Sequence, residues 1–241
     1  MAEFLTFRLY APLQSWGDVS PGENRTTWTG PSRSALAGLI GAALGLRRED
    51  PELSALHLGL RFAVRHEGRK VRQLVDFHTA QTPHGIGFRI NRGTELSEVK
   101  AGNGGTILSD RYYLQDAVFA VAAWSVSGIS LDRLRRALSC PAFMLYLGRK
   151  SCPLALPLGA VIIDSETAAA ALDAYPVTWE PAVDLLEPPG ANVTATSDVD
   201  EKAGFKAEQI RYRRDVCVDP ILRLFQERQE LVATVQMPGA C

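Results

Sequence analysis

The order of strand-like and helix-like segments constrains the fold of this chain more than any single motif does. Alternating apolar side chains predict a strand over residues 4–13, and Pro31 with Ser32 as N-cap opens a helix that runs to Leu46. This helix is followed by two strands at 60–67 and 71–78 and by a long irregular stretch at 79–110. A strand at 113–126, a helix at 130–139 and a strand at 142–147 come next. This order predicts an α+β fold with a ferredoxin-like antiparallel sheet, as in a modified RRM.

The two strand-like segments at 60–67 and 71–78 are separated only by Gly68, Arg69 and Lys70. So short a connection predicts a hairpin, in which the two strands pair with each other.

Three glycines in the predicted helix, Gly38, Gly41 and Gly45, have spacings of three and four residues and therefore share one face. Such a face allows a strand or a ligand backbone to approach closely. We expect tight packing of the helix on the sheet to account for it.

Residues 79–110 form a long stretch without sustained periodicity, and they include six glycines. Irregular stretches of this length inside a domain are commonly functional or flexible. We expect a projection at about 80–110 that is mobile in the free chain and becomes ordered only against a partner.

The charge is unevenly distributed, although the formal net charge of the 241 residues is only -1. Residues 1–155 have 19 basic and 13 acidic side chains, whereas residues 156–241 have 7 basic and 14 acidic ones. This asymmetry predicts an RRM-like RNA-binding domain over 1–155. Residues 156–241 are expected to form a small β-rich C-terminal subdomain, including a mobile acidic segment at about 187–206, whose acidic surface faces a protein.

Composition excludes several classes of protein. No apolar run reaches the length of a membrane span and the first residues lack a signal core, so we expect a cytoplasmic location without membrane contact. The four cysteines are far apart and no histidine lies near them at ligand spacing. We therefore expect no disulfide framework, no metal site and no cofactor.

Catalytic signals are weak. The four histidines fall in no known signature, and the sequence indicates no catalytic residue. His78 could act as a base toward an RNA 2′-hydroxyl, with Arg111 and either Tyr112 or Tyr113 as partners, but a histidine at a strand end is more often structural. The Gly148–Ser151 segment departs from a phosphate-binding P-loop and remains a short cationic turn.

Aromatic and basic side chains alternate in the irregular segments, a combination that suits single-stranded nucleic acid. Rings could stack on bases while arginines contact phosphates. The competing interpretation is that the tryptophans anchor the first loop and the arginines are merely solvated. These residues are Trp16, Arg25, Trp28, Phe88, Arg89, Arg92, Lys100, Arg111, Tyr112 and Tyr113.

Four sequence segments together resemble a known family. They are RLYAPLQSWG at 8–17, GPSRSALAGLIGAALG at 30–45, DFHT at 76–79 and YLGRKSCPL at 146–154, with Arg25 between the first two. In this order they resemble the CasD-type subunit of the type I-E CRISPR Cascade complex, a member of the RAMP superfamily. The resemblance covers most of residues 4–163 and does not extend into the C-terminal third.

The resemblance implies an RRM core with a thumb-like insertion and a non-catalytic role. A protein of this family would cap the 5′ handle of the CRISPR RNA and link the backbone subunit to the large subunit, with target DNA contacted only indirectly. Relatives in the type I-C system cleave precursor RNA, so a metal-independent endoribonuclease is the alternative. Combining resemblance and residue type, we expect RNA contacts from Gln14, Trp16, Arg25, Arg33, Ser34, Arg89, Arg92, Lys100, Arg111, Tyr112, Arg149 and Lys150.

Overall fold

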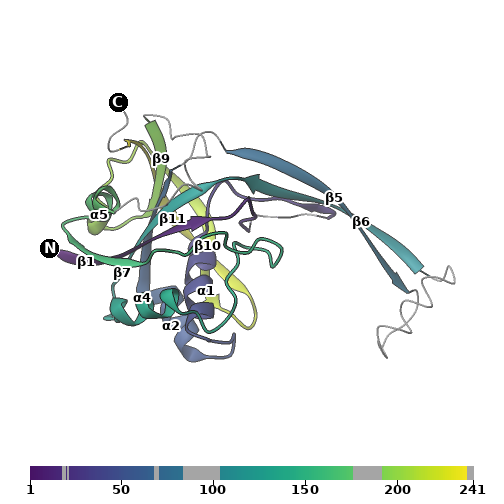
Figure 1. Cartoon of the computed structure of the whole chain (residues 1–241), viewed down its shortest axis with the longest axis horizontal. Helices are drawn as coiled ribbons and strands as arrows, with labels where there is room; N and C mark the ends of the chain where they lie inside the picture. Colours follow the sequence, from purple (N-terminus) through teal and green to yellow (C-terminus); the bar gives the residue numbers. More distant parts are fainter. Residues whose placement is uncertain (18–19, 21, 68–70, 84–103, 176–191, 238–241) are drawn as a thin grey trace.

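The computed structural model describes residues 1–17, 20, 22–67, 71–83, 104–175 and 192–237. Its main feature is a seven-stranded antiparallel sheet in the order β10-β11-β9-β4-β7-β1-β8 (Figure 1). The strands are β1 Ala2–Tyr10, β4 Leu60–His66, β7 Val118–Ser125, β8 Val161–Ser165, β9 Asn192–Asp198, β10 Gln209–Asp219 and β11 Leu224–Gln236. The predicted α+β fold with an antiparallel sheet is confirmed.

Helices cover both faces of this sheet because its central strands alternate apolar side chains on both sides. Leu5 and Phe7 of β1 face α1 (Arg33–Ala43) and α4 (Leu131–Ser139). Phe4 of β1 and Trp124 of β7 face α5 (Ala168–Ala174) on the other side. The sheet is therefore the middle layer, and α1, α2 and α4 lie together on one side of it (Figure 1).

Hydroxyl side chains begin three of the helices. Ser32, Ser130 and Thr167 each accept a hydrogen bond from the backbone N–H three residues later, as N-caps do. Ser32 is the cap that the sequence predicts, and Ser130 begins the helix predicted at 130–139. A further helix, α2 (Pro51–Gly59), was not among the predicted elements, although Asp50 followed by Pro51 is a helix-start signal.

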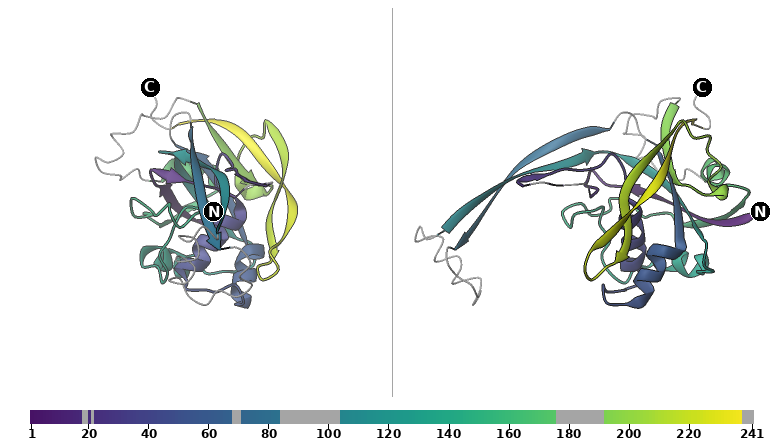
Figure 2. Two further views of the ribbon diagram at one scale, coloured as in Figure 1. Left: turned by 90° about the vertical axis from the view of Figure 1, so that its right-hand side faces the viewer. Right: turned by 180° about the vertical axis from the view of Figure 1, so that it is seen from behind.

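A second sheet is formed around a long two-stranded ribbon, β5 (Arg72–Pro83) and β6 (Gly104–Gln115). The short strands β2 (Leu13–Gln14) and β3 (Asn24–Arg25) pair with β6 at its base. The ribbon projects from the body of the molecule, where the sequence predicts a thumb-like insertion (Figures 1 and 2).

The strand partners differ from the predicted ones. Residues 60–67 and 71–78 form no hairpin, because β4 pairs with β7 and β9 whereas β5 pairs with β6 in the other sheet. The predicted strand at 142–147 is also wrong: the segment has only an isolated bridge between Tyr146 and Pro153. Residues 79–83 and 104–110 are regular strand rather than irregular loop.

The C-terminal third does not form a sheet of its own. Its strands β8 to β11 join the sheet that contains β1, β4 and β7. Residues 192–198 of the predicted mobile segment form strand β9, in which several side chains are buried. Residues 201–203 form a 3₁₀ turn, and the remainder of the acidic segment before 192 lies outside the described residues. The physical reason is that β9 pairs with both β4 and β11, which orders a segment of weakly apolar composition.

No described helix is long and apolar enough to cross a membrane.

Candidate nucleic-acid interface

A groove of about 970 Å³ lies between α1, the base of the ribbon, the segment 143–149 and the tip of the β10–β11 hairpin. Figure 2 shows this hairpin, in yellow, running down beside α1 and α2. The groove therefore brings together residues that are more than 200 positions apart in the chain.

Six arginines line this groove, and no aspartate or glutamate is among its described lining residues. A concave surface lined by charges of one sign concentrates the field and attracts oppositely charged ligands. Tyr146, Phe143 and Phe225 add aromatic rings to the same lining. We call this surface the arginine groove; its arginines are Arg25, Arg47, Arg48, Arg111, Arg149 and Arg223.

Arg149 is held in position in the lining of the groove. Its guanidinium lies 4.7 Å from the centre of the Tyr113 ring, and its Nη2 donates to the Arg25 carbonyl oxygen at 2.8 Å. Its Nη1 has no hydrogen-bond partner within the described part of the chain. Arg149 is thus a fixed part of the groove wall.

The backbone next to Arg149 explains why the sequence segments 8–17 and 146–154 occur in the same chain. Gly148 has φ +88°, and a Cβ there would come within 1.6 Å of the Ser15 carbonyl oxygen. The Ser15 N–H also donates to the Leu147 carbonyl at 3.1 Å. Only glycine allows the basic turn to dock against the first loop.

Gln14 and Trp16 support the loop rather than line the groove. They are 0% and 1% exposed and neither lines the groove, so the predicted contacts of these side chains with RNA are not made there. The Trp16 Nε1–H donates to Gln14 Oε1 at 3.2 Å, and the Gln14 amide donates to the Ala117 carbonyl. Their polar atoms are used to satisfy each other and the backbone, as buried polar groups require.

Arg33 is likewise buried, and the predicted contact with RNA is wrong for it in this structure. Its Nη2 donates to the carbonyls of His57 and Leu60 at 2.9 and 3.1 Å, and its Nη1 lies 3.5 Å from Asp198. Its backbone N–H donates to Asp215 at 2.9 Å. These contacts attach the start of α1 to the C-terminal strands.

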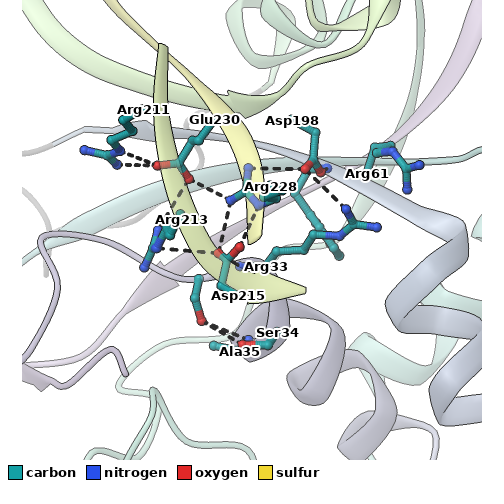
Figure 3. Close-up of polar contacts among 12 residues, drawn as sticks. Arg33, Ser34, Ala35, Arg61, Asp198, Arg211, Arg213, Asp215, Arg228 and Glu230 are labelled. Carbon is teal, nitrogen blue, oxygen red and sulfur yellow. Dashed lines mark hydrogen bonds and ion pairs between the residues drawn. The ribbon is translucent and has the colours of Figure 1, made fainter. Parts of the chain in front are cut away.

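Arg33 is part of a larger cluster of buried ion pairs (Figure 3). Arg228 joins the three acids: its Nε lies 2.7 Å from Asp215, its Nη2 2.7 Å from Glu230 and its Nη1 3.2 Å from Asp198. We call this set the buried ion cluster; its members are Arg33, Arg213, Arg228, Asp198, Asp215 and Glu230. It fixes the β10–β11 hairpin, and so one wall of the arginine groove, against α1.

Burial and ion pairing shift the pKa values within the cluster in opposite directions. Burial raises the pKa of Asp198, and Arg228, Arg33 and the N–H of Phe62 act against this rise. Desolvation lowers the pKa of Arg228, but hydrogen bonds and charges from its acidic neighbours overcome it and raise the pKa above the usual value.

The same cluster uses three acids of the C-terminal third inside the protein, and the protein-facing surface expected of this third stays a prediction. Asp198, Asp215 and Glu230 are at most 4% exposed and neutralise arginines. The third also contributes Cys217, Pro220, Arg223 and Phe225 to the groove.

The remaining predicted contacts fall into three groups. Arg25, Ser34, Arg111 and Arg149 are brought together in the groove. Tyr112 follows Arg111 in a regular strand, so its side chain points to the opposite face, and Lys150 is exposed outside the groove lining. Arg89, Arg92 and Lys100 lie outside the described residues.

Sequence reasoning missed three of the groove arginines, Arg47, Arg48 and Arg223. The Arg47–Arg48 pair directly after the predicted helix was a usable signal, because two adjacent arginines form a local basic patch. Arg223 gave no such signal, since its place depends on how the β10–β11 hairpin folds back onto α1 and α2.

His57 adds a neutral polar group to the groove lining. Burial, together with the smaller effect of the nearby Arg33 charge, lowers its pKa to about 4. The side chain is 5% exposed and its Nδ1 has no hydrogen-bond partner among the described residues.

The residues of the alternative nuclease site are not assembled. His78 shares a ribbon face with Arg111, but Tyr112 points to the other face and Tyr113 is 5% exposed beneath Arg149. No group of three or more His, Cys, Asp or Glu residues in the described ranges could hold a metal ion.

The geometry defines a mixed α+β protein with a cationic groove and a projecting ribbon. Over residues 4–216 the chain matches the family described as CRISPR-associated protein (Cas_Cas5). The chain belongs to this Cas5 family of CRISPR-associated proteins.

Relatives agree with this assignment. The CRISPR system Cascade subunit CasD of Escherichia coli (strain K12) is 37% identical over 169 residues, covering 66% of this chain and 70% of that protein. One solved chain, from a CRISPR RNA-guided surveillance complex, superposes with a TM-score of 0.64 at 28% identity and covers 99% of this chain and 92% of its own length. Another, from a crystal structure of a Cas protein, has a TM-score of 0.62 at 30% identity, with 98% and 95% covered.

Proposed function

We propose that this chain is a non-catalytic RNA-binding subunit of a Cascade-type CRISPR surveillance complex in the cytoplasm. In this role it caps the 5′ handle of the CRISPR RNA and links the backbone subunit to the large subunit, while target DNA is contacted only indirectly. No cofactor is required for this role.

The observation that carries the proposal is the arginine groove. Six arginines from five separate parts of the chain converge on one concavity whose described lining has no acidic residue. Elsewhere this chain pairs its buried arginines with carboxylates, so the absence of such partners in the groove indicates an external anion.

The aromatic rings favour a single-stranded polynucleotide over a small anion. Tyr146 and Phe143 are 38% and 44% exposed on the same wall as Arg149, and exposed rings beside cations are the features on which bases stack while phosphates are bound. A bent single strand can follow a groove built from loops and a hairpin tip, whereas a duplex is too wide and stiff to do so.

We also interpret the four neighbouring strands β4, β7, β1 and β8 as a ferredoxin-like core. The support is the chain order β1-α1-β4-β7-α4-β8, with α2 inserted before β4, in one antiparallel sheet. The ribbon β5–β6 then corresponds to the thumb-like insertion between the two halves.

A non-catalytic role is supported by the dispersal of the candidate acid and base. A metal-independent ribonuclease needs a base and an acid on opposite sides of one phosphate, and the described residues place His78 and Tyr112 on different faces of the ribbon.

The experiment removes three groove arginines that come from three different elements, in the variant Arg25→Ala/Arg47→Ala/Arg223→Ala. We expect its affinity for a single-stranded CRISPR-repeat RNA to fall at least tenfold. The slope of log affinity against log salt should fall by about 0.7 for each phosphate that is no longer bound by an arginine. Binding is measured over a series of salt concentrations without metal, and the RNA is then analysed for cut product, which we expect to be absent.

A matched control removes the same charge from another surface. Arg133, Arg135 and Arg136 are exposed on α4 outside the groove lining, and their triple replacement by alanine should leave the salt slope unchanged. Equal losses of affinity in both triple variants would overturn the groove as the RNA site. Cut RNA that disappears in His78→Ala would favour the processing nuclease.

A further inference from the structure

Gly38 lies in the middle of α1 without a packing reason for being glycine. A Cβ built on it meets nothing within 4 Å, whereas a Cβ on Gly41 of the same helix would come within 2.6 Å of Leu53 Cδ1. Gly45, the third of these glycines, has φ +78° just after the helix end. The predicted packing on the sheet is therefore wrong for this face: Gly41 accommodates α2, Gly45 ends the helix, and Gly38 faces open space.

A glycine inside a helix destabilises it relative to alanine, because it has more backbone freedom to lose. Where no neighbouring group in the protein requires a glycine, the space above the glycine is available to a ligand. At Gly38 the question is therefore what approaches the helix so closely.

The space above Gly38 is a small apolar cavity of about 230 Å³ that opens off the arginine groove. Ala35, Gly38 and Ala42 form its floor on α1, and Tyr146, Met144 and Trp16 are among its other lining residues. Ala35, Gly38, Ala42, Tyr146 and Gly148 line both the cavity and the groove. A ligand in the groove can thus extend directly into the cavity.

The cavity differs from the groove in chemistry and in size. Its described lining has no charged residue, so it does not suit a phosphate. Its volume is below the roughly 300–1,000 Å³ of pockets for whole drug-sized ligands, which leaves room for one flat ring system. Small residues on the floor and the Tyr146 side chain beside them fit such a ring.

We propose that the cavity above Gly38 holds one nucleobase of the RNA whose phosphates are bound by the arginine groove. The base lies flat on α1 at the position where the helix has no side chain, beside Tyr146, and the adjoining phosphates contact arginines such as Arg149. This inference rests on the proposed function and adds a base-reading site to a groove that otherwise contacts the RNA backbone.

The test fills the cavity without removing any charge. Gly38→Leu places a side chain in it, and Gly38→Ala is the smaller matched change; both replace glycine by a better helix former. We expect both variants to melt about 2–4 °C higher than the wild type, which shows that the fold is intact. Affinity for single-stranded CRISPR-repeat RNA should fall about tenfold in Gly38→Leu and less in Gly38→Ala, with the salt slope unchanged in both.

A scan of the same RNA with a single abasic nucleotide identifies the inserted base. In the wild type, one position should weaken binding about as much as Gly38→Leu does, and that position should have no further effect in the Gly38→Leu variant. This loss of additivity is specific to a base in the cavity.

The outcomes separate the two proposals. If the wild type does not bind the RNA, the proposed function fails. If it binds but Gly38→Leu binds equally well, or if the abasic effects add fully to that of the variant, then no base enters the cavity. An intact RNA affinity with loss of a protein subunit from the assembled complex would show that the cavity takes an apolar side chain of a partner.

Discussion

The buried ion cluster and the arginine groove use the same side chain in opposite ways. In the cluster, Arg228 contacts three carboxylates and is 11% exposed. In the groove, Arg25, Arg47 and Arg223 are exposed and the described lining offers no carboxylate. The two regions are adjacent, because the hairpin that carries Arg228 also carries Arg223 at its tip.

This difference shows that charge composition alone does not reveal a binding surface. A buried arginine must be paired, because an uncompensated charge in the interior is strongly destabilising. An exposed one is stable without a partner because water solvates it. Arginines that stay unpaired on a concave surface are therefore the ones available to a ligand.

The largest expected effect comes from breaking the cluster with Asp215→Ala. This change removes one of the three carboxylates around Arg228 and the acceptor of the Arg33 N–H, and it should lower the free energy of unfolding by about 3–5 kcal/mol. Thermal melting should shift down by roughly 10 °C. Asp132→Ala, which removes an exposed carboxylate from the ion pairs of α4, is the control and should leave the melting temperature almost unchanged. A similar loss of stability in both variants would mean that the cluster does not differ from surface ion pairs.

A smaller effect comes from His57, where the two regions meet. Its pKa is about 4 in the folded protein and near 6.5 when unfolded, so the unfolded chain binds more protons between these values. The contribution of His57 to the free energy of unfolding is then complete above about pH 6.5 and is lost as the pH falls toward 4. The loss between pH 7 and pH 5 should be about 2 kcal/mol, and it should be absent for this residue in His57→Gln. Denaturant unfolding of both proteins at the two pH values measures the difference, and equal pH dependence would show that His57 is not held neutral.

The smallest effect on stability is expected for Arg149→Lys, in the groove. Lysine keeps the charge but lacks the planar stacking on Tyr113 and the fixed direction of the guanidinium, so stability should fall by less than about 1 kcal/mol. RNA affinity should nevertheless fall several-fold, with an unchanged salt slope. Arg135→Lys on α4 is the control, and we expect it to alter neither property. A large loss of stability without loss of affinity would place Arg149 with the structural arginines instead.

The sequence by itself determined the local elements and the class of the fold. The N-caps Ser32 and Ser130, the alternation of residues in β1 and the apolar β7 all follow from contacts within a few residues of each other. Such short-range rules state that a segment is a strand or a helix, and the set of motifs was enough to resemble the right family.

Only the tertiary structure decided the strand partners and the roles of individual side chains. An alternating segment can pair with any suitable neighbour, so the sequence could not show that β4 joins β7 and β9 rather than β5. Nor could it separate Gln14 and Trp16, which the fold buries, from Arg25 and Arg149, which it leaves in the groove. The reason is physical: burial and ion pairing depend on residues that are distant in the chain, and here Asp215 and Arg228 determine the surroundings of Arg33 across more than 180 positions.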